Sequence, residues 1–234
     1  MSVAFRTLYG EVLRYAPEAP GVLVNDVLRE AARDFFSRSH AWRETVDLTL
    51  VDGQDTYEIL NTPDPDADPD PIPANVPAFY DSVNGYYHVD VVSWHEVRYA
   101  DEPLKKRTAA ETHRQVPTPT EIFWGFENPT KDTIRLIGTP GANEDGETLT
   151  VTISVKPSRQ ARSIISDEMV DLYKDAIVNG AVARLLLIPR QPWTNPNQAS
   201  YHMIRFDEAI LDADNRAQTQ YSRHIVRKTR YGGL

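Results

Sequence analysis

The sequence predicts an α+β fold, in which a helical bundle frame holds an inserted β-rich module. Apolar residues recur with a period of 3.6 early in the chain and again near its end, and between these stretches the period changes to two. The last residues are basic and contain a Gly-Gly pair. We therefore expect a helical frame at 1–43 and 157–221, a β-rich module at 44–156 and an extended C-terminal arm at 222–234.

The frame begins with a weak helical signal and then a strong one. Residues 3–19 are moderately apolar and stop at Pro17 and Pro20, which predicts a short helix or a packed arm. From about Pro20 to Ser39 the charged residues take one face of a helix, and Trp42 is expected to anchor the exit of this helix. The other face is apolar and consists of Val24, Val27, Leu28, Ala31 and Phe35.

The β-rich module starts at Arg43, where apolar and polar residues begin to alternate. The run from Val46 to Leu50, a turn at Asp52-Gly53 and the return from Tyr57 to Ile59 predict a hairpin. Residues 61–75 hold prolines and aspartates in alternation and are expected to form an exposed, extended loop, because proline removes backbone donors. Further strands are expected at 86–94, 121–126, 133–137 and 148–155, with a short helix at 108–115 and a turn at 144–146.

The strongest signal is a helical hairpin between Ser166 and Tyr221. Ser166 is an expected N-cap, Pro189 ends the first helix, and Asn195-Pro196 starts the second. The first stripe consists of Met169, Tyr173, Ala176, Gly180, Ala183 and Leu187, and the second of Ala199, Met203, Phe206, Ile210, Ala213 and Ala217. Small residues in the first stripe should let the two backbones approach closely.

The second helix also has apolar residues on the face opposite its stripe. Tyr201, Ile204 and Leu211 fall roughly 120–200° away from the stripe at 100° per residue. They pack either against the β-rich module or against another subunit.

Composition excludes several classes of function. The 234 residues include no cysteine, so disulfides, thiolate nucleophiles and Cys-ligated zinc are absent. No signal peptide is predicted, because residues 1–6 lack a basic region followed by an apolar one. No membrane span is predicted, because the longest apolar run, 176–188, contains Asn179, Gly180 and Arg184.

The net charge of −9 is unevenly distributed along the chain. Between Asp47 and Pro103 there are thirteen acidic residues and one base, Arg98, which gives −12. The side chains of the C-terminal arm carry +4. The protein is therefore expected to have an acidic middle and a basic end.

No pattern in the chain indicates an enzyme, a metal site or a cofactor. The run Asp64, Asp66, Asp68 and Asp70 lacks the glycine and the final glutamate of a calcium loop, so a solvated loop is favoured over weak calcium binding. The six histidines have no zinc-motif spacing and are expected to be core or surface residues. No serine elbow or phosphate-binding glycine loop is present.

The C-terminal arm mixes positive charge with apolar side chains. Such a segment can bind phosphates, fold into a groove on an acidic protein, or stay unstructured. The residues concerned are Arg223, His224, Ile225, Val226, Arg227, Lys228, Arg230, Tyr231 and Leu234.

The ordered set of elements resembles the head-to-tail adaptor (connector) proteins of tailed double-stranded-DNA bacteriophages, especially short-tailed ones. The resembling segments span most of 22–217: Val27–Phe36 with Trp42–Glu44, Thr133–Ile137 with Pro140, Leu149–Pro157, Gly180–Leu187, and Pro192–Pro196 with Tyr201 and Phe206. The acidic loop at 61–75 departs from the family pattern as an insertion.

This resemblance implies a structural protein of the virion head-tail junction, assembled in the host cytoplasm and not an enzyme. It implies a homo-oligomeric ring, a dodecamer in most such proteins, beneath the portal, with double-stranded DNA passing through it without sequence-specific contacts. The C-terminal arm would bind the portal protein, the β-rich module would face a downstream tail or nozzle protein, and Tyr201, Ile204 and Leu211 would lie between subunits. A tail-tube or tail-completion protein is the alternative, and a soluble hydrolase with an acidic or His/Asp site is a remote one.

Overall fold

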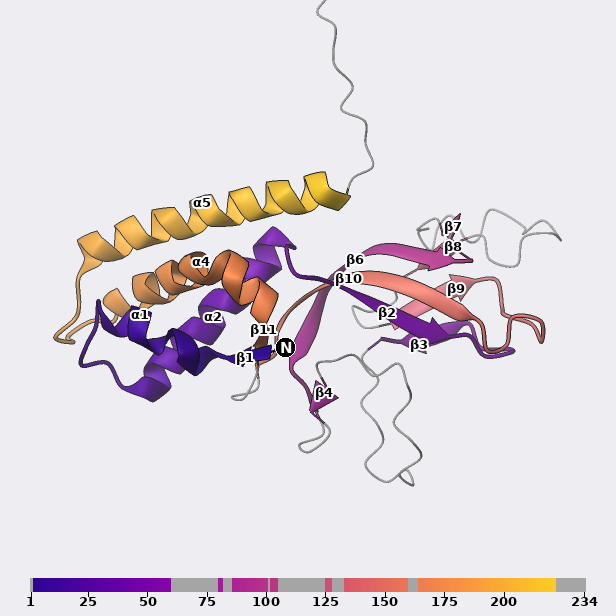
Figure 1. The fold of residues 1–234 in the computed structure, drawn as a ribbon, viewed down its shortest axis with the longest axis horizontal. Helices are drawn as coiled ribbons and strands as arrows, with labels where there is room; N and C mark the ends of the chain where they lie inside the picture. Colours follow the sequence, from indigo (N-terminus) through magenta and orange to yellow (C-terminus); the bar gives the residue numbers. More distant parts are fainter. Residues whose placement is uncertain are drawn as a thin grey trace, which may run out of the picture.

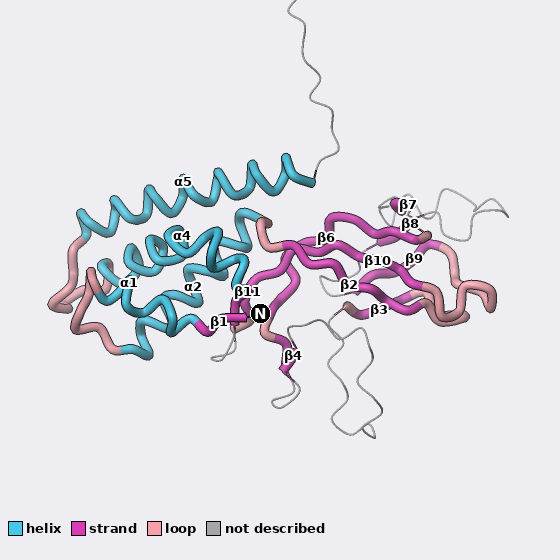
Figure 2. Tube along the Cα trace, viewed as in Figure 1, coloured by secondary structure: helices cyan, strands magenta, loops and turns pink. Residues whose placement is uncertain are grey.

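The computed structural model has an α+β fold, with helices at one end of the molecule and strands at the other (Figure 1, Figure 2). It describes residues 2–59, 80–81, 86–100, 102–104, 125–127, 133–159 and 164–221. The helical elements are the 3-10 helix η1 (Phe5–Leu8) and the helices α1 (Tyr9–Leu13), α2 (Gly21–Ser39), α4 (Asp167–Leu186) and α5 (Pro196–Tyr221). The strands are β1 (Ser2–Ala4), β2 (Arg43–Thr49), β3 (Thr56–Glu58), β4 (Tyr80–Asp81), β5 (Tyr86–Tyr87), β6 (Val89–Tyr99), β7 (Glu102–Pro103), β8 (Gly125–Glu127), β9 (Thr133–Ile137), β10 (Thr148–Pro157) and β11 (Ile164–Ser166).

The N-terminal residues form a packed arm that contains a short helix. Strand β1 pairs antiparallel with β11, with Val3 opposite Ile165, and η1 and α1 follow directly. Phe5, Leu8 and Val12 are buried against the helices, as apolar residues at helical spacing should be. This pairing joins the two ends of the predicted frame, and the sequence pattern did not reveal it.

Helix α2 has the bounds and the buried face that its sequence predicts. Val24, Leu28, Ala31 and Phe35 are fully buried, while Val27 is half-buried. The helix ends at His40, whose φ of 49° is left-handed and whose N–H donates to the Phe36 carbonyl.

Helices α4 and α5 form the predicted antiparallel hairpin, and α5 lies across α4 and α2 (Figure 1). Asn195 caps α5: its Oδ1 accepts from the Gln198 backbone N–H at 3.2 Å. Ser166 is the N-cap residue of α4 but makes no side-chain capping bond. The prediction that Leu187 belongs to the buried stripe was wrong, because α4 ends at Leu186 and Leu187 is 51% exposed.

The predicted hairpin between Val46 and Ile59 was also wrong. A turn does occur there, with Gly53 at φ 78°, but the strands on either side of it enter different sheets. Strand β2 pairs with β10 over seven residues in the four-stranded sheet β2-β10-β6-β7. Strand β3 pairs with β9 in the sheet β3-β9-β8. A long partner strand supplies more ladder hydrogen bonds than the three residues of β3 can.

The other strand predictions agree with the structure where it describes them. Strand β9 matches 133–137, and β10 extends the predicted 148–155 by two residues. The predicted strand at 86–94 is divided, because Tyr86–Tyr87 form β5, which pairs with β4, and β6 runs from Val89 beyond Trp94 to Tyr99. The turn at 144–146 is present, with Gly146 at φ 82°. Of the predicted strand at 121–126 the described part is Gly125 and Phe126, which belong to β8. The loop at 61–75, the helix at 108–115 and the C-terminal arm lie outside the described residues.

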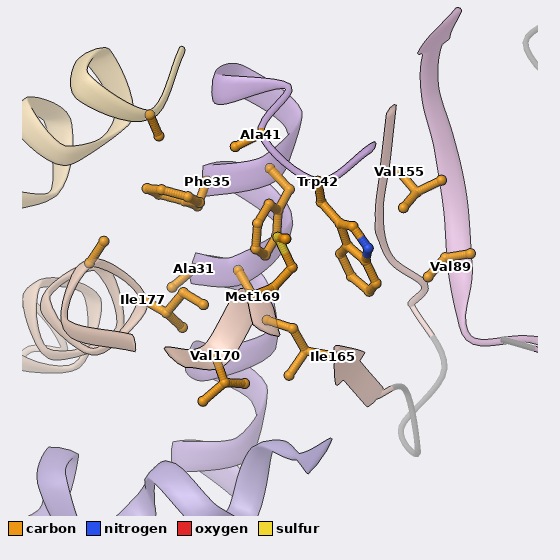
Figure 3. Packing of buried hydrophobic residues seen from close by; sticks show 14 of the residues in the cluster. Ala31, Phe35, Ala41, Trp42, Val89, Val155, Ile165, Met169, Val170 and Ile177 are labelled. Carbon is orange, nitrogen blue, oxygen red and sulfur yellow. The ribbon is translucent and has the colours of Figure 1, made fainter. Parts of the chain in front are cut away.

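Trp42 links the helical core with the strands (Figure 3). Its ring is fully buried between Phe36 of α2, at 5.3 Å between ring centroids, and the strand residues Val89 and Val155. The Val155 N–H donates to the Trp42 carbonyl at 2.9 Å, and the Trp42 indole donates to Glu44 Oε1 at 2.6 Å. Burial raises the pKa of Glu44, an effect that the Trp42 hydrogen bond opposes. The predicted anchoring role of Trp42 is confirmed.

Candidate assembly interface

The outer face of α5 exposes the three apolar residues that the sequence singled out. Tyr201, Ile204 and Leu211 are 55%, 59% and 64% exposed. Their interpretation as residues that pack against the β-rich module was therefore wrong for the single chain. An exposed apolar set along one helix is the surface on which another protein chain packs most readily.

These side chains point outward because the opposite face of α5 is held by the core. Ala199, Phe206, Ile210, Ala213 and Ala217 are buried against α4 and α2. Their spacing leaves positions 201, 204 and 211 on the far side of the helix.

One ion pair joins α5 to α2, a second joins α4 to α2, and a ring contact joins α4 to α5. Arg38 of α2 contacts Asp207 of α5 at 2.8 Å, and Arg184 of α4 contacts Asp34 of α2 at 2.7 Å. The Arg184 guanidinium also lies 5.1 Å from the centroid of the Phe206 ring. The exposed face is therefore carried by a helix with a fixed orientation.

Polar neighbours orient Tyr201 within this face. The Arg205 guanidinium lies 5.6 Å from the Tyr201 ring centroid, and Arg205 Nε donates to the Tyr201 hydroxyl at 3.4 Å. This hydrogen bond raises the pKa of Arg205. Arg205 also contacts Glu208 at 3.8 Å. An apolar strip with a charged margin is typical of protein interfaces.

His202 lies beneath the face and is a core residue. It is 4% exposed, its Nδ1 lies 2.7 Å from Asn179 Oδ1 of α4, and its ring packs edge-on against Tyr15 at 4.8 Å. Burial lowers the pKa of His202. The expectation of core or surface histidines is confirmed at this position.

A second polar cluster, which the sequence did not reveal, lies where α2 meets the sheet. His40 Nδ1 lies 3.2 Å from Ser93 Oγ and 3.3 Å from Ser154 Oγ, and His95 Nε2 lies 3.4 Å from Ser93 Oγ. Burial, with smaller effects from Arg43 and His40, lowers the pKa of His95 to about 4. Ser154 is fully buried and sits between two register shifts in the pairing of β10 with β6. The hydroxyls of Ser154 on β10 and Ser93 on β6 lie 2.8 Å apart, so this cluster joins the two strands to His40 at the end of α2.

Two of the predicted features cannot be placed in the structure. The C-terminal arm, from Arg223 to Leu234, and the run from Asp64 to Asp70 lie outside the described residues. Within the described ranges, no three His, Asp or Glu side chains gather as metal ligands. The helices of the described ranges are all too short or too polar to cross a bilayer.

Comparison with protein families gives a match over nearly the whole chain. A family model described as "SU10 adaptor protein" matches residues 3–228. This range covers the helices, the strands and the first part of the C-terminal arm. A search of curated proteins finds no match.

Proposed function

Because the chain belongs to the SU10 adaptor protein family, we propose that it forms a homo-oligomeric ring that joins the portal to the tail of a phage and surrounds the DNA channel. Membership of this family makes it a phage adaptor and a structural protein of the virion. The match over 3–228 is the observation that carries the proposal. Assembly, rather than a reactive side chain, is its mechanism.

The exposed face of α5 supports ring formation. A closed ring of identical subunits needs one surface that packs on a different surface of the next subunit. Tyr201, Ile204 and Leu211 supply apolar area on α5, and burying the part of each aliphatic side chain that is still exposed contributes roughly 1–2 kcal/mol. A stable interface buries at least about 1,000 Å², so further residues flank this set.

The C-terminal arm is proposed to bind the portal protein, and the β-rich module to face a downstream tail or nozzle protein. The arm's residues, Arg223 to Leu234, combine four positive side chains with apolar ones. Such a segment can become ordered when it binds a partner's surface, and it loses conformational entropy only then. The ring would be a dodecamer if it follows most head-to-tail adaptors.

The acidic middle of the chain is proposed to face passing DNA without holding it. A segment with a side-chain charge of −12 repels phosphates within about 8–10 Å at physiological salt. The purified ring should therefore leave duplex DNA unbound at moderate salt. Binding of a duplex through residues 47–103 would contradict this part of the proposal.

Two variants test the proposed interfaces separately. Ile204→Asp with Leu211→Asp should leave a folded subunit that no longer forms rings, because charged side chains resist burial between subunits. Val22→Asp, at a residue that is 77% exposed in the first turn of α2, is the matched control and should form rings.

Removal of residues 222–234 should leave rings that do not bind the portal. Normal rings from the double variant, or normal portal binding by the truncated chain, would contradict the corresponding assignment.

A further inference from the structure

A small cavity opens on the β-rich end of the molecule, away from the α5 face. It has a volume of about 250 Å³ and is lined by Arg98, Ala100, Thr148 and Thr150. Arg98 and Thr150 are register partners on β6 and β10, and the next pair, Val97 and Val151, is fully buried. Because side chains alternate across a strand, the cavity lies on the outer face of the four-stranded sheet.

The guanidinium of Arg98 is incompletely paired in this cavity. Its Nε lies 3.3 Å from Glu96 Oε1, yet this buried atom has no partner in hydrogen-bonding geometry. Within the described ranges, Glu96 is the ionic partner of Arg98. This Nε is closed off from solvent, so the donors that a ligand can reach are the other guanidinium nitrogens of Arg98, whose side chain is 30% exposed. Arg98 is also the one base among thirteen acids between Asp47 and Pro103.

The threonine hydroxyls set the polarity of the cavity. Thr150 Oγ1 donates its hydrogen to Asp47 Oδ1 at 2.9 Å, so it offers only lone pairs to a ligand. Thr148 lines the same space, and a threonine hydroxyl can turn its hydrogen toward a ligand. Arg98 and Thr148 together therefore present donors, which select a ligand that accepts.

Ala100 at the rim of the cavity has a strained backbone conformation. It follows β6 and has a φ of 48°. A positive φ favours asparagine or glycine and is unfavourable for alanine. Strained residues are found where function requires a particular side chain or shape.

We propose that this cavity binds a single carboxylate, presented by one acidic side chain of a partner protein whose surrounding surface is neutral or basic. A guanidinium matches a carboxylate in two parallel hydrogen bonds, and the Glu96 contact shows that a carboxylate already approaches one edge of it. A volume of about 250 Å³ is below the roughly 300–1,000 Å³ of most ligand pockets, which fits one side chain. The proposal is independent of ring formation.

A nucleic-acid phosphate is the less favourable occupant. Phosphate binding by proteins depends on several basic side chains acting together. The segment around Arg98 carries −12, and Glu96 and Asp47 lie beside the cavity. A partner side chain can place one carboxylate on Arg98 and keep the rest of its surface neutral or basic.

The test uses methyl NMR of the full chain with labelled alanine and threonine, in which Ala100 and Thr148 report on the cavity. The probes are N-acetyl-glutamate amide and its uncharged analogue N-acetyl-glutamine amide, at matched ionic strength. The glutamate probe should shift both methyl signals in a saturable way, and the glutamine probe should not. Equal responses to both probes, a response only to a short DNA duplex, or no saturable response to the glutamate probe would overturn the proposal.

Three variants separate the site from general charge effects. Arg98→Lys keeps the positive charge but removes the planar guanidinium, so the affinity for the glutamate probe should fall about tenfold. Glu96→Gln removes the internal competitor and should strengthen binding about threefold or more. Glu102→Gln makes the same change of net charge at an exposed residue outside the cavity, and should leave the affinity unchanged. Equal strengthening by Glu96→Gln and Glu102→Gln would show that long-range charge, rather than this cavity, governs the response.

Discussion

Gly180 of α4 lies so close to Phe206 of α5 that a Cβ on Gly180 would stand 2.6 Å from Cε2 of the ring. The same added atom would lie 3.1 Å from the Ala31 Cβ of α2. Three helices therefore converge at a point where no side chain fits. The crossing fixes the orientation of α5, and with it the direction of Tyr201, Ile204 and Leu211.

Gly180→Ala should destabilise the subunit. Forcing a methyl group into this contact costs about 1–3 kcal/mol, which exceeds the roughly 0.5–1 kcal/mol that alanine gains over glycine in a helix. Gly10→Ala in α1 is the control, because an added Cβ there meets nothing within 4 Å. Urea unfolding followed by circular dichroism compares the two. A Gly180→Ala variant as stable as the wild type would show that the helices separate easily.

Arg184 should contribute more to stability than Arg38, although both contact Asp34. Arg184 is 26% exposed, donates to the Gly180 carbonyl at 2.8 Å and covers the Phe206 ring, so Arg184→Ala should cost about 1–3 kcal/mol. Arg38 is 48% exposed, so Arg38→Ala should cost about 0–1 kcal/mol. The free energies of unfolding of the two variants give the comparison. A larger loss from Arg38→Ala would reverse the proposed order.

The helical part of the fold follows closely from sequence, since its determinants are local. The Asn195-Pro196 start, the Pro189 stop and the two stripes predict α4 and α5 almost to the residue. Helical periodicity reports which face is buried, and capping residues report where a helix begins. Leu187 shows the limit, because an apolar residue one position beyond the helix loses the geometry that would bury it.

Strand pairing and the cavity depend on contacts between distant residues. Alternation identified β2 and β3 as strands, but the period of two does not say which strand each one joins. The β1–β11 pair and the Ser93–Ser154 contact join residues more than sixty positions apart. Arg98 stood out in the sequence only as the one base in an acidic segment. Its cavity depends on the register of β6 with β10 and on the turn at Ala100.

Stability should fall as the pH drops below about 6.5, in part because of His95. Its folded pKa is about 4 and its unfolded value 6.5, so the unfolded chain binds more protons between these values. The contribution of His95 is therefore present above about pH 6.5 and is lost as the pH falls toward 4. NMR titration of the imidazole signal should give a midpoint near pH 4.

Arg43→Gln should raise the pKa of His95 but leave it below 6.5, because burial is the largest cause and the positive charge of Arg43 a smaller one. Arg14→Gln, which removes an exposed arginine on the arm before α2, is the matched control and should not move it. A His95 midpoint near 6.5 in the wild type would contradict the lowered pKa described here.

The assembly of the purified chain is the central claim, and native mass spectrometry tests it most directly. The chain has a mass of 26.5 kDa. For the purified chain, either alone or mixed with a portal ring, the spectrum should show a single closed oligomer whose mass is a fixed multiple of the subunit mass. The Ile204→Asp, Leu211→Asp variant should give monomers under the same conditions. A wild-type chain that stays monomeric with and without the portal would contradict the proposed ring.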